Sequence, residues 1–126
     1  MTLRIAFGFK LFAFFTIFVN SKWITLMKTR QEYIQILTEH IAELAERFGV
    51  RSLILFGSVA RDEHHEGSDV DVFVDMPPKF FLACAAADYL EEILGCKVDL
   101  VRNNKNISDF FRKQVMSDGI QIFPAA

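Results

Sequence analysis

Residues 53–75, LILFGSVARDEHHEGSDVDVFVD, carry the pattern that decides the fold. Four apolar residues lead into Gly57-Ser58, a polar segment follows, and from Asp69 onward acidic and apolar residues alternate. Alternation is typical of a strand with one buried face, because successive side chains point to opposite sides of a sheet. The stretch therefore predicts two strands joined by a tight turn and a short link. Asp69 and Asp71 would share one face, and the valines at 70, 72 and 74 would share the other.

The two aspartates predict a metal site. Neighbouring carboxylates on one strand face repel each other and are costly without a compensating cation. Mg²⁺ suits this arrangement, because it usually takes one or two protein carboxylates and completes its shell with water and substrate phosphates. The turn predicts an anion site beside it, since Gly57 permits close approach of a ligand and a helix beginning near Ser58 would present free N–H groups. A phosphate site next to a metal site indicates nucleotide chemistry.

The rest of the chain predicts helices and two further strands. Thr29 and Glu32 form a capping box that starts a helix continuing to Gly49, with one apolar stripe. Further elements are expected as a helix at 79–94, a strand at 97–102, a helix at 108–117 and a strand at 120–123. The link between the strands at 53–56 and 69–75 is too short for a long crossover helix. We therefore expect an α+β fold, a small mixed β-sheet with helices packed on it, rather than a doubly wound sheet.

Composition limits the function classes. The chain has 126 residues, enough for one domain, and the part after residue 26 has a net charge of −5. An acidic chain without a basic stripe is a poor template-binding polymerase, so we expect no direct binding of nucleic acid. Cys84 and Cys96 lack metal-ligand spacing and are expected to be reduced, packing as small apolar residues, with a disulfide as the less favoured alternative.

The central pattern resembles the signature of the DNA polymerase beta-like nucleotidyltransferase superfamily. The similarity rests on GSVAR at 57–61, a gap of six residues, and SDVD at 68–71. It is closest to the minimal nucleotidyltransferases (MNT), small partners of HEPN-domain proteins in bacteria and archaea, and covers roughly residues 27–123. One departure is Asp62, where the family often has glycine after the arginine. The resemblance implies the nucleotidyltransferase (polymerase beta-like) fold.

The resemblance also implies a set of roles. Asp69, Asp71 and Asp99 would be the catalytic triad that holds two Mg²⁺ ions, with Asp99 as the third acid; Asp99 could instead pair with a lysine or cap a loop. Gly57 and Ser58 would bind the β- and γ-phosphates of ATP, with Ser68 also predicted to contact the nucleotide. Arg61 would neutralise phosphate charge, although a surface ion pair explains it equally well. His64 and His65 lie in the polar link and are not expected to act directly.

The function implied is transfer of AMP from ATP to a hydroxyl of a protein partner, a tyrosine of a cognate HEPN toxin, by an antitoxin. Two alternatives stay open: a small-molecule nucleotidyltransferase, and a non-catalytic antitoxin acting by binding. The protein-modifying enzyme is favoured because a chain this small has no acceptor domain of its own. A hetero-oligomer with the toxin would be consistent with this.

Residues 1–26 differ from the rest of the chain, with six of the fourteen phenylalanines and no acid. Their apolar run at 11–19 is too short to span a bilayer. The favoured interpretation is a start codon assigned too early, with Met27 as the true start of a nucleotidyltransferase domain at 27–126. A membrane-associated segment and an extra helix packed on the domain are the alternatives. Because ATP is intracellular, we expect a cytoplasmic protein without stable membrane insertion.

Overall fold

The computed structural model describes residues 28–124. The segment 1–26 lies outside the described residues, so its interpretation stays a prediction. Among the helices of the described part, none is long and apolar enough to cross a membrane.

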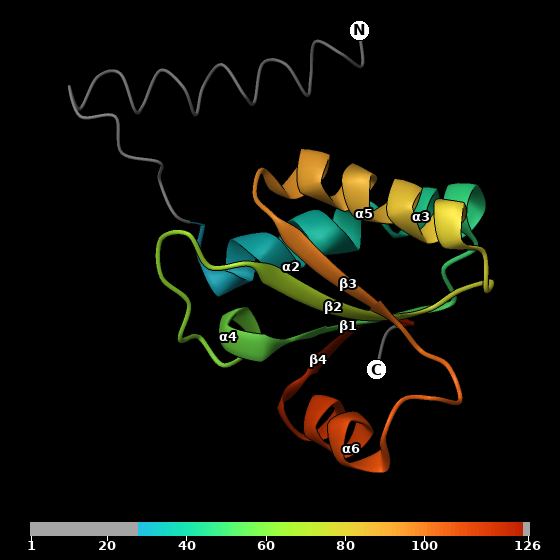
Figure 1. Cartoon of the computed structure of the whole chain (residues 1–126). Coiled ribbons are helices and arrows are strands. Elements are labelled where there is room, and N and C mark those ends of the chain that lie inside the picture. The colour runs from blue at the N-terminus through green and yellow to red at the C-terminus, as the bar shows by residue number, and fades with distance from the viewer. Residues whose placement is uncertain (1–27, 125–126) are drawn as a thin grey trace, which may run out of the picture.

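A four-stranded mixed sheet forms the centre of the fold (Figure 1), and its strands lie in the order β3-β2-β1-β4. The strands are β1 (Ser52–Phe56), β2 (Val70–Asp75), β3 (Val98–Arg102) and β4 (Ile120–Phe123). Strand β1 runs antiparallel to β2 and β4, whereas β2 and β3 are parallel. The predicted α+β fold with a mixed sheet is confirmed. The first three strands each begin one residue away from the expected position. The shift matters at β2, which begins at Val70, so Asp69 precedes the strand instead of starting it.

Helices cover both faces of this sheet (Figure 1), with α2, α3 and α5 on one side and α6 on the other. They are α2 (Arg30–Glu39), α3 (Ile41–Phe48), α5 (Phe80–Leu94) and α6 (Asp109–Asp118). A single helical turn, α4 (Gly57–Ala60), follows β1 directly. The core is accordingly split in two. Val70, Val72 and Val74 are fully buried under α2, α3 and α5, while Ile54 and Phe73 pack against Val115 of α6.

The N-terminal helical region consists of two helices, where one continuous helix was predicted. The expected start is confirmed, because Thr29 and Glu32 form the capping box. The interruption comes at His40, whose backbone N–H donates to the carbonyl oxygen of Leu37 at 3.2 Å instead of continuing the α-helical ladder. The hydroxyl of Thr38 also donates to the carbonyl oxygen of Ile34 at 2.7 Å, a contact that bends helices. The apolar stripe alone could not reveal this break, because its spacing continues through it.

The two cysteines are free, as predicted. Cys96 is partly buried and packs against the main core. Cys84 is exposed on α5, so the expectation that it packs as a buried apolar residue is wrong. The reason is helical position, since the buried residues of α5 are Ala86, Leu90 and Leu94.

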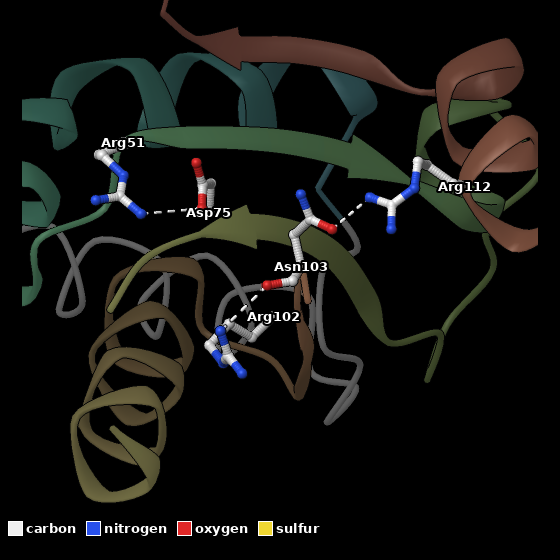
Figure 2. A network of polar contacts seen from close by, with 5 residues as sticks. All are labelled: Arg51, Asp75, Arg102, Asn103 and Arg112. Atoms are coloured by element: carbon white, nitrogen blue, oxygen red, sulfur yellow. Dashed lines mark hydrogen bonds and ion pairs between the residues drawn. The ribbon is translucent and has the colours of Figure 1, made fainter. Parts of the chain in front are cut away.

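Polar contacts fix the end of the sheet where β2 and β3 finish (Figure 2). Arg51 pairs with Asp75 at 3.2 Å across the first two strands. Arg112 of α6 donates to the side-chain oxygen of Asn103, and Arg102 donates to the carbonyl oxygen of Asn103 at 3.2 Å. These bonds hold the loop between β3 and α6, and thus the start of α6, at this end of the sheet.

Gly119 joins α6 to β4 where the two elements leave no room for a side chain. A Cβ there would overlap the side chain of Ile54 and the carbonyl oxygen of Val115. We therefore expect Gly119→Ala to lower the free energy of unfolding by about 1–3 kcal/mol, the usual cost of overpacking. Urea denaturation measures this, and the exposed neighbour Ser117→Ala should stay within about 0.5 kcal/mol of the wild type. Equal midpoints for the two variants would contradict the assignment.

Candidate active site

Two of the three predicted acids lie opposite each other on neighbouring strands. Asp71 of β2 pairs in register with Asp99 of β3, and because these strands are parallel the two side chains share one face of the sheet. Phe73 lies two residues further along β2, on the same face, and is buried under α6. The acids are thus placed on the α6 side, at the end of the sheet where β2 and β3 begin.

The pKa of the Asp71 carboxyl reflects both its burial and the charges near it. Partial burial raises the pKa of the Asp71 carboxyl, and the negative charges of Asp99 and Asp69 raise it further. The positive charge of Arg61 acts in the opposite direction on the same pKa. Asp69 and Asp99 are exposed, whereas Asp71 is half-buried. Asp71 is therefore the half-buried acid of the three, and the charges of Asp99, Asp69 and Arg61 all act on its carboxyl group.

The glycine turn lies directly against this carboxylate. Phe56, the last residue of β1, pairs with Asp71, so Gly57 follows at the same level of the sheet. Gly57 has φ of +77°, in the left-handed region that favours glycine. A Cβ at Gly57 would overlap the Oδ2 atom of Asp71. Absence of a side chain is therefore required both by the backbone and by the space that the carboxylate occupies.

The two predicted serines have different surroundings. Ser58 is half-buried in α4, and its carbonyl oxygen accepts the backbone N–H of Glu63 at 2.8 Å. The Oγ atom of Ser68 accepts a hydrogen bond from the backbone N–H of His65 at 2.9 Å. The backbone N–H of Ser68 donates to the carbonyl oxygen of His65. Ser68 thus closes the turn that leads into Asp69, while its hydroxyl hydrogen stays available to donate.

Arg61 forms the surface ion pair that is one of its two predicted roles. Its Nε donates to the Glu63 carboxylate at 2.9 Å, and its Nη1 lies 4.0 Å from the Asp118 carboxylate at the end of α6. The guanidinium is therefore part of a surface ion pair. It is also close enough to Asp71 to lower the pKa of that carboxyl. A cation consequently stands beside the acidic cluster, within reach of a nucleotide placed there.

Asp62 has a left-handed backbone conformation, which glycine adopts readily. This conformation accounts for the frequent glycine at this position in the family that the sequence resembles. The φ of Asp62 is +60°, and it is the non-glycine residue with positive φ among the described residues. Aspartate tolerates this left-handed conformation better than most side chains. Asp62 therefore adopts, in this turn, a backbone conformation that glycine favours.

Substitutions at Asp62 should follow from this conformation. We expect Asp62→Val to lower the free energy of unfolding by roughly 1–2 kcal/mol, because a β-branched side chain is strained at positive φ. Asp62→Gly should change it by less than about 1 kcal/mol, since relief of strain is offset by the greater entropy of glycine in the unfolded chain. Urea denaturation of both variants checks this, and equal effects would show that the left-handed conformation carries no cost here.

Arg30 is a supporting residue that the sequence did not reveal. Its Nη1 donates to the carbonyl oxygen of Ala60 at 3.1 Å, which ties the start of α2 to the end of α4. The two residues are 30 positions apart, and a charged residue in the first turn of a helix looks like ordinary surface. Arg30 supports the glycine turn only because α2 packs beside α4, and the sequence does not show this packing.

The donor set fits a hard divalent cation. Burial and the negative charges of Asp99 and Asp69 raise the pKa of the Asp71 carboxyl, and a cation of charge +2 would offset the effect of those charges. As the side chains are positioned within residues 28–124, no three His, Cys, Asp or Glu residues form a group that would hold a metal ion alone. A metal ion held here would therefore need ligands besides these side chains, such as water or substrate phosphates.

Similar proteins carry names that indicate nucleotidyl transfer. A Methanocaldococcus jannaschii protein, named provisionally as a protein adenylyltransferase, is 37% identical over 98 residues, covering 76% of this chain and all of its own. The protein adenylyltransferase MntA of Thermococcus cleftensis is 48% identical over 77 residues, which are 60% of this chain and 78% of that protein. A solved structure named provisionally as a minimal nucleotidyltransferase is 30% identical with a TM-score of 0.61, covering 74% of this chain and 95% of the other.

A further solved structure shares the fold at lower identity. It is described as a tri-AMPylated HEPN toxin of Shewanella oneidensis in complex with MNT antitoxin, and it is 20% identical with a TM-score of 0.55, covering 77% of this chain and 74% of that one. The profile of the nucleotidyltransferase domain family matches residues 37–122, a span that contains the glycine turn and all three acids. The chain therefore belongs to the nucleotidyltransferase domain family, as an enzyme of the minimal nucleotidyltransferase type.

Proposed function

We propose that this protein transfers AMP from ATP to a hydroxyl group of a protein partner, a tyrosine of a cognate HEPN toxin, and thereby acts as an antitoxin. The observation that carries the proposal is the placement of Asp71 in register with Asp99, with Gly57 directly against the Asp71 carboxylate. Three acids beside a phosphate turn are what nucleotidyl transfer requires. They are less easily explained in a protein that acts by binding alone, because their mutual repulsion costs stability.

The reaction would proceed by attack of the acceptor oxygen on the α-phosphorus of ATP. The bond from the α-phosphorus to the bridging oxygen would break, pyrophosphate would leave, and the hydroxyl proton would pass to a base, a role that we assign to the Asp99 carboxylate. Gly57 and Ser58 would hold the β- and γ-phosphates through backbone N–H groups and the hydroxyl. With α4 only four residues long, these N–H groups matter more than a helix dipole. Arg61 would neutralise phosphate charge.

Asp69, Asp71 and Asp99 would hold Mg²⁺ together with the phosphates of ATP. When bound, the metal would supply positive charge that offsets the negative charge developing in the transition state. The chain's own contribution is to fix Asp71 and Asp99 in register on one sheet face.

The relatives support a protein as the acceptor. The two curated relatives described above are both named as protein adenylyltransferases. The surface of the described part also offers contact area, since Phe80 and Phe81 of α5 are more than 70% exposed and their ring centroids lie 5.4 Å apart. Exposed apolar side chains that lie together commonly mark protein–protein sites. A partner that extends over this part of α5 would add surface that this small chain lacks.

Mass spectrometry tests the proposal. A HEPN-domain protein from the same genome, incubated with this chain and Mg·ATP, should gain the mass of one or more AMP units on a tyrosine. With the double variant Asp69→Asn/Asp71→Asn, the HEPN-domain protein should gain no AMP mass. Circular dichroism of the double variant should show an intact fold.

A growth assay separates modification from binding. If the double variant still protects cells from the toxin, neutralisation occurs by binding and the enzymatic account is wrong. Absence of any AMP adduct with the wild-type chain would contradict the proposal directly.

A further inference from the structure

His64 is turned inward from a loop that is otherwise mostly exposed. Of residues 61–69, only His64 and Ser68 are partly buried. The Nε2 atom of His64 lies 2.8 Å from the carbonyl oxygen of Lys28, just before α2. Its ring packs edge-on against Tyr33, with centroids 5.9 Å apart and an interplanar angle of 67°. Tyr33 is itself a core residue, 5% exposed. The imidazole therefore connects the loop to the N-terminal part of α2.

The hydrogen-bonding pattern fixes the tautomer of this ring. A carbonyl oxygen can only accept, so Nε2 of His64 must carry the hydrogen that it donates to Lys28. The Nδ1 atom is buried and finds no hydrogen-bond partner among the described residues. A neutral ring with hydrogen on Nε2 satisfies this arrangement, because it leaves no buried N–H without an acceptor. The contact is thus a specific donor to a specific carbonyl.

The residues just before and at the start of α2 also contact α4, the helical turn that begins at Gly57. Arg30 donates to the carbonyl oxygen of Ala60 at 3.1 Å, while Lys28 accepts from His64. The residues just before and at the start of α2 therefore hold two points of the segment that joins the glycine turn to Asp69. Arg61 lies between these two points, and Asp69 lies five residues beyond His64.

We propose that His64 is a positioning residue for nucleotidyl transfer. Its hydrogen bond to the Lys28 carbonyl, supported by the ring of Tyr33, holds the loop so that Arg61 and Asp69 stay beside Asp71. This rests on the proposed function, because it assigns the loop its place in the same active site. His64 touches neither substrate nor metal in this scheme; it acts through the loop.

Three substitutions at His64 and one control separate this role from simple packing. His64→Phe keeps the ring against Tyr33 but cannot donate, and His64→Ala removes both contacts. His64→Gln keeps an amide N–H that can reach the Lys28 carbonyl. His65→Ala is the matched control, because His65 is exposed in the same loop and its ring contacts only the neighbouring carbonyl oxygen of Glu66, at 2.9 Å.

We expect kcat/KM for AMP transfer to fall about 10- to 100-fold in His64→Phe and His64→Ala, because misplacing reacting groups by about 1 Å costs this much. His64→Gln should recover to within about threefold of the wild type, and His65→Ala should stay within about twofold. A wild-type rate in His64→Phe would overturn the proposal, and so would a His64→Gln variant as impaired as His64→Phe.

Amide hydrogen exchange supplies a readout that does not depend on activity. The amides of residues 61–68 should exchange faster in His64→Phe than in the wild type, and His65→Ala should show no such change. Unchanged exchange in His64→Phe would overturn the proposal. If the wild-type chain modifies no acceptor and binds no Mg·ATP, the proposed function fails. The exchange experiment still decides in that case whether His64 holds the loop.

Discussion

Replacing Asp71 with asparagine is expected to lower the rate of AMP transfer by about a thousandfold. The carboxylate lies at the centre of the acidic cluster, in register with Asp99 and against Gly57. Metal-assisted stabilisation of transition-state charge is worth several kcal/mol, and about 4 kcal/mol corresponds to a factor of a thousand. Asparagine keeps the shape but removes the charge. Transfer of labelled AMP to the acceptor, and calorimetric titration with ATP in the presence and absence of Mg²⁺, measure the loss.

Asp75→Asn is the matched control for this variant. Asp75 lies on the same strand and, by alternation, on the same face as Asp71, but at the far end of β2. It pairs with Arg51 at 3.2 Å on the surface (Figure 2), an interaction that contributes little to stability. We expect its rate to stay within about twofold of the wild type. Similar losses in both variants would show that Asp71 has no special place in a metal site.

The Asp71→Asn variant should also be more stable than the wild type when divalent cations are removed with EDTA. The folded-state pKa of Asp71 is raised by burial and by Asp99 and Asp69, so its contribution to stability is full at low pH and is lost as pH rises through that pKa. At neutral pH the ionised carboxylate therefore opposes folding. A higher melting temperature with lost activity would show that this charge is kept for function, whereas a lower one would contradict the assigned repulsion.

The arrangement of the acids could be predicted from sequence because it depends on local period. Alternation at 69–75 placed Asp71 opposite the buried valines, and the apolar neighbours of Asp99 did the same for β3. The register that brings Asp71 and Asp99 together is set by pairing between separate strands. From the sequence, the proximity of Asp71 and Asp99 could be inferred only through resemblance to a family.

Features that depend on contacts between distant segments could not be predicted. The histidines at 64 and 65 look alike in sequence, yet one reaches the Lys28 carbonyl, 36 positions away, and the other stays exposed. The break at His40 is likewise invisible in the apolar stripe, because it results from hydrogen bonds of Thr38 and His40 to the preceding turn. The sequence indicated the left-handed conformation of Asp62 only indirectly, because related sequences often have glycine at this position.

Gly57→Ala is expected to reduce AMP transfer by about a hundredfold. Two costs combine at this residue. Its φ of +77° is strained for any L-amino acid, at roughly 1–2 kcal/mol. The added Cβ would also overlap Oδ2 of Asp71, so either the turn or the carboxylate must move. A shift of about 1 Å in a catalytic group can cost a factor of a hundred. Steady-state kinetics with Mg·ATP measure the effect, and urea denaturation measures the accompanying loss of stability.

Gly67→Ala separates these two costs. Gly67 has a similarly positive φ of +87°, but a Cβ there would meet nothing within 4 Å. It therefore reports the backbone penalty alone, and its rate of AMP transfer should stay within about threefold of the wild type. The difference between the two variants isolates the contact between the turn and Asp71. If Gly57→Ala loses stability to the same extent as Gly67→Ala and keeps its activity, the carboxylate does not need the space that glycine leaves. The close approach of turn and acid would then not be part of the catalytic geometry.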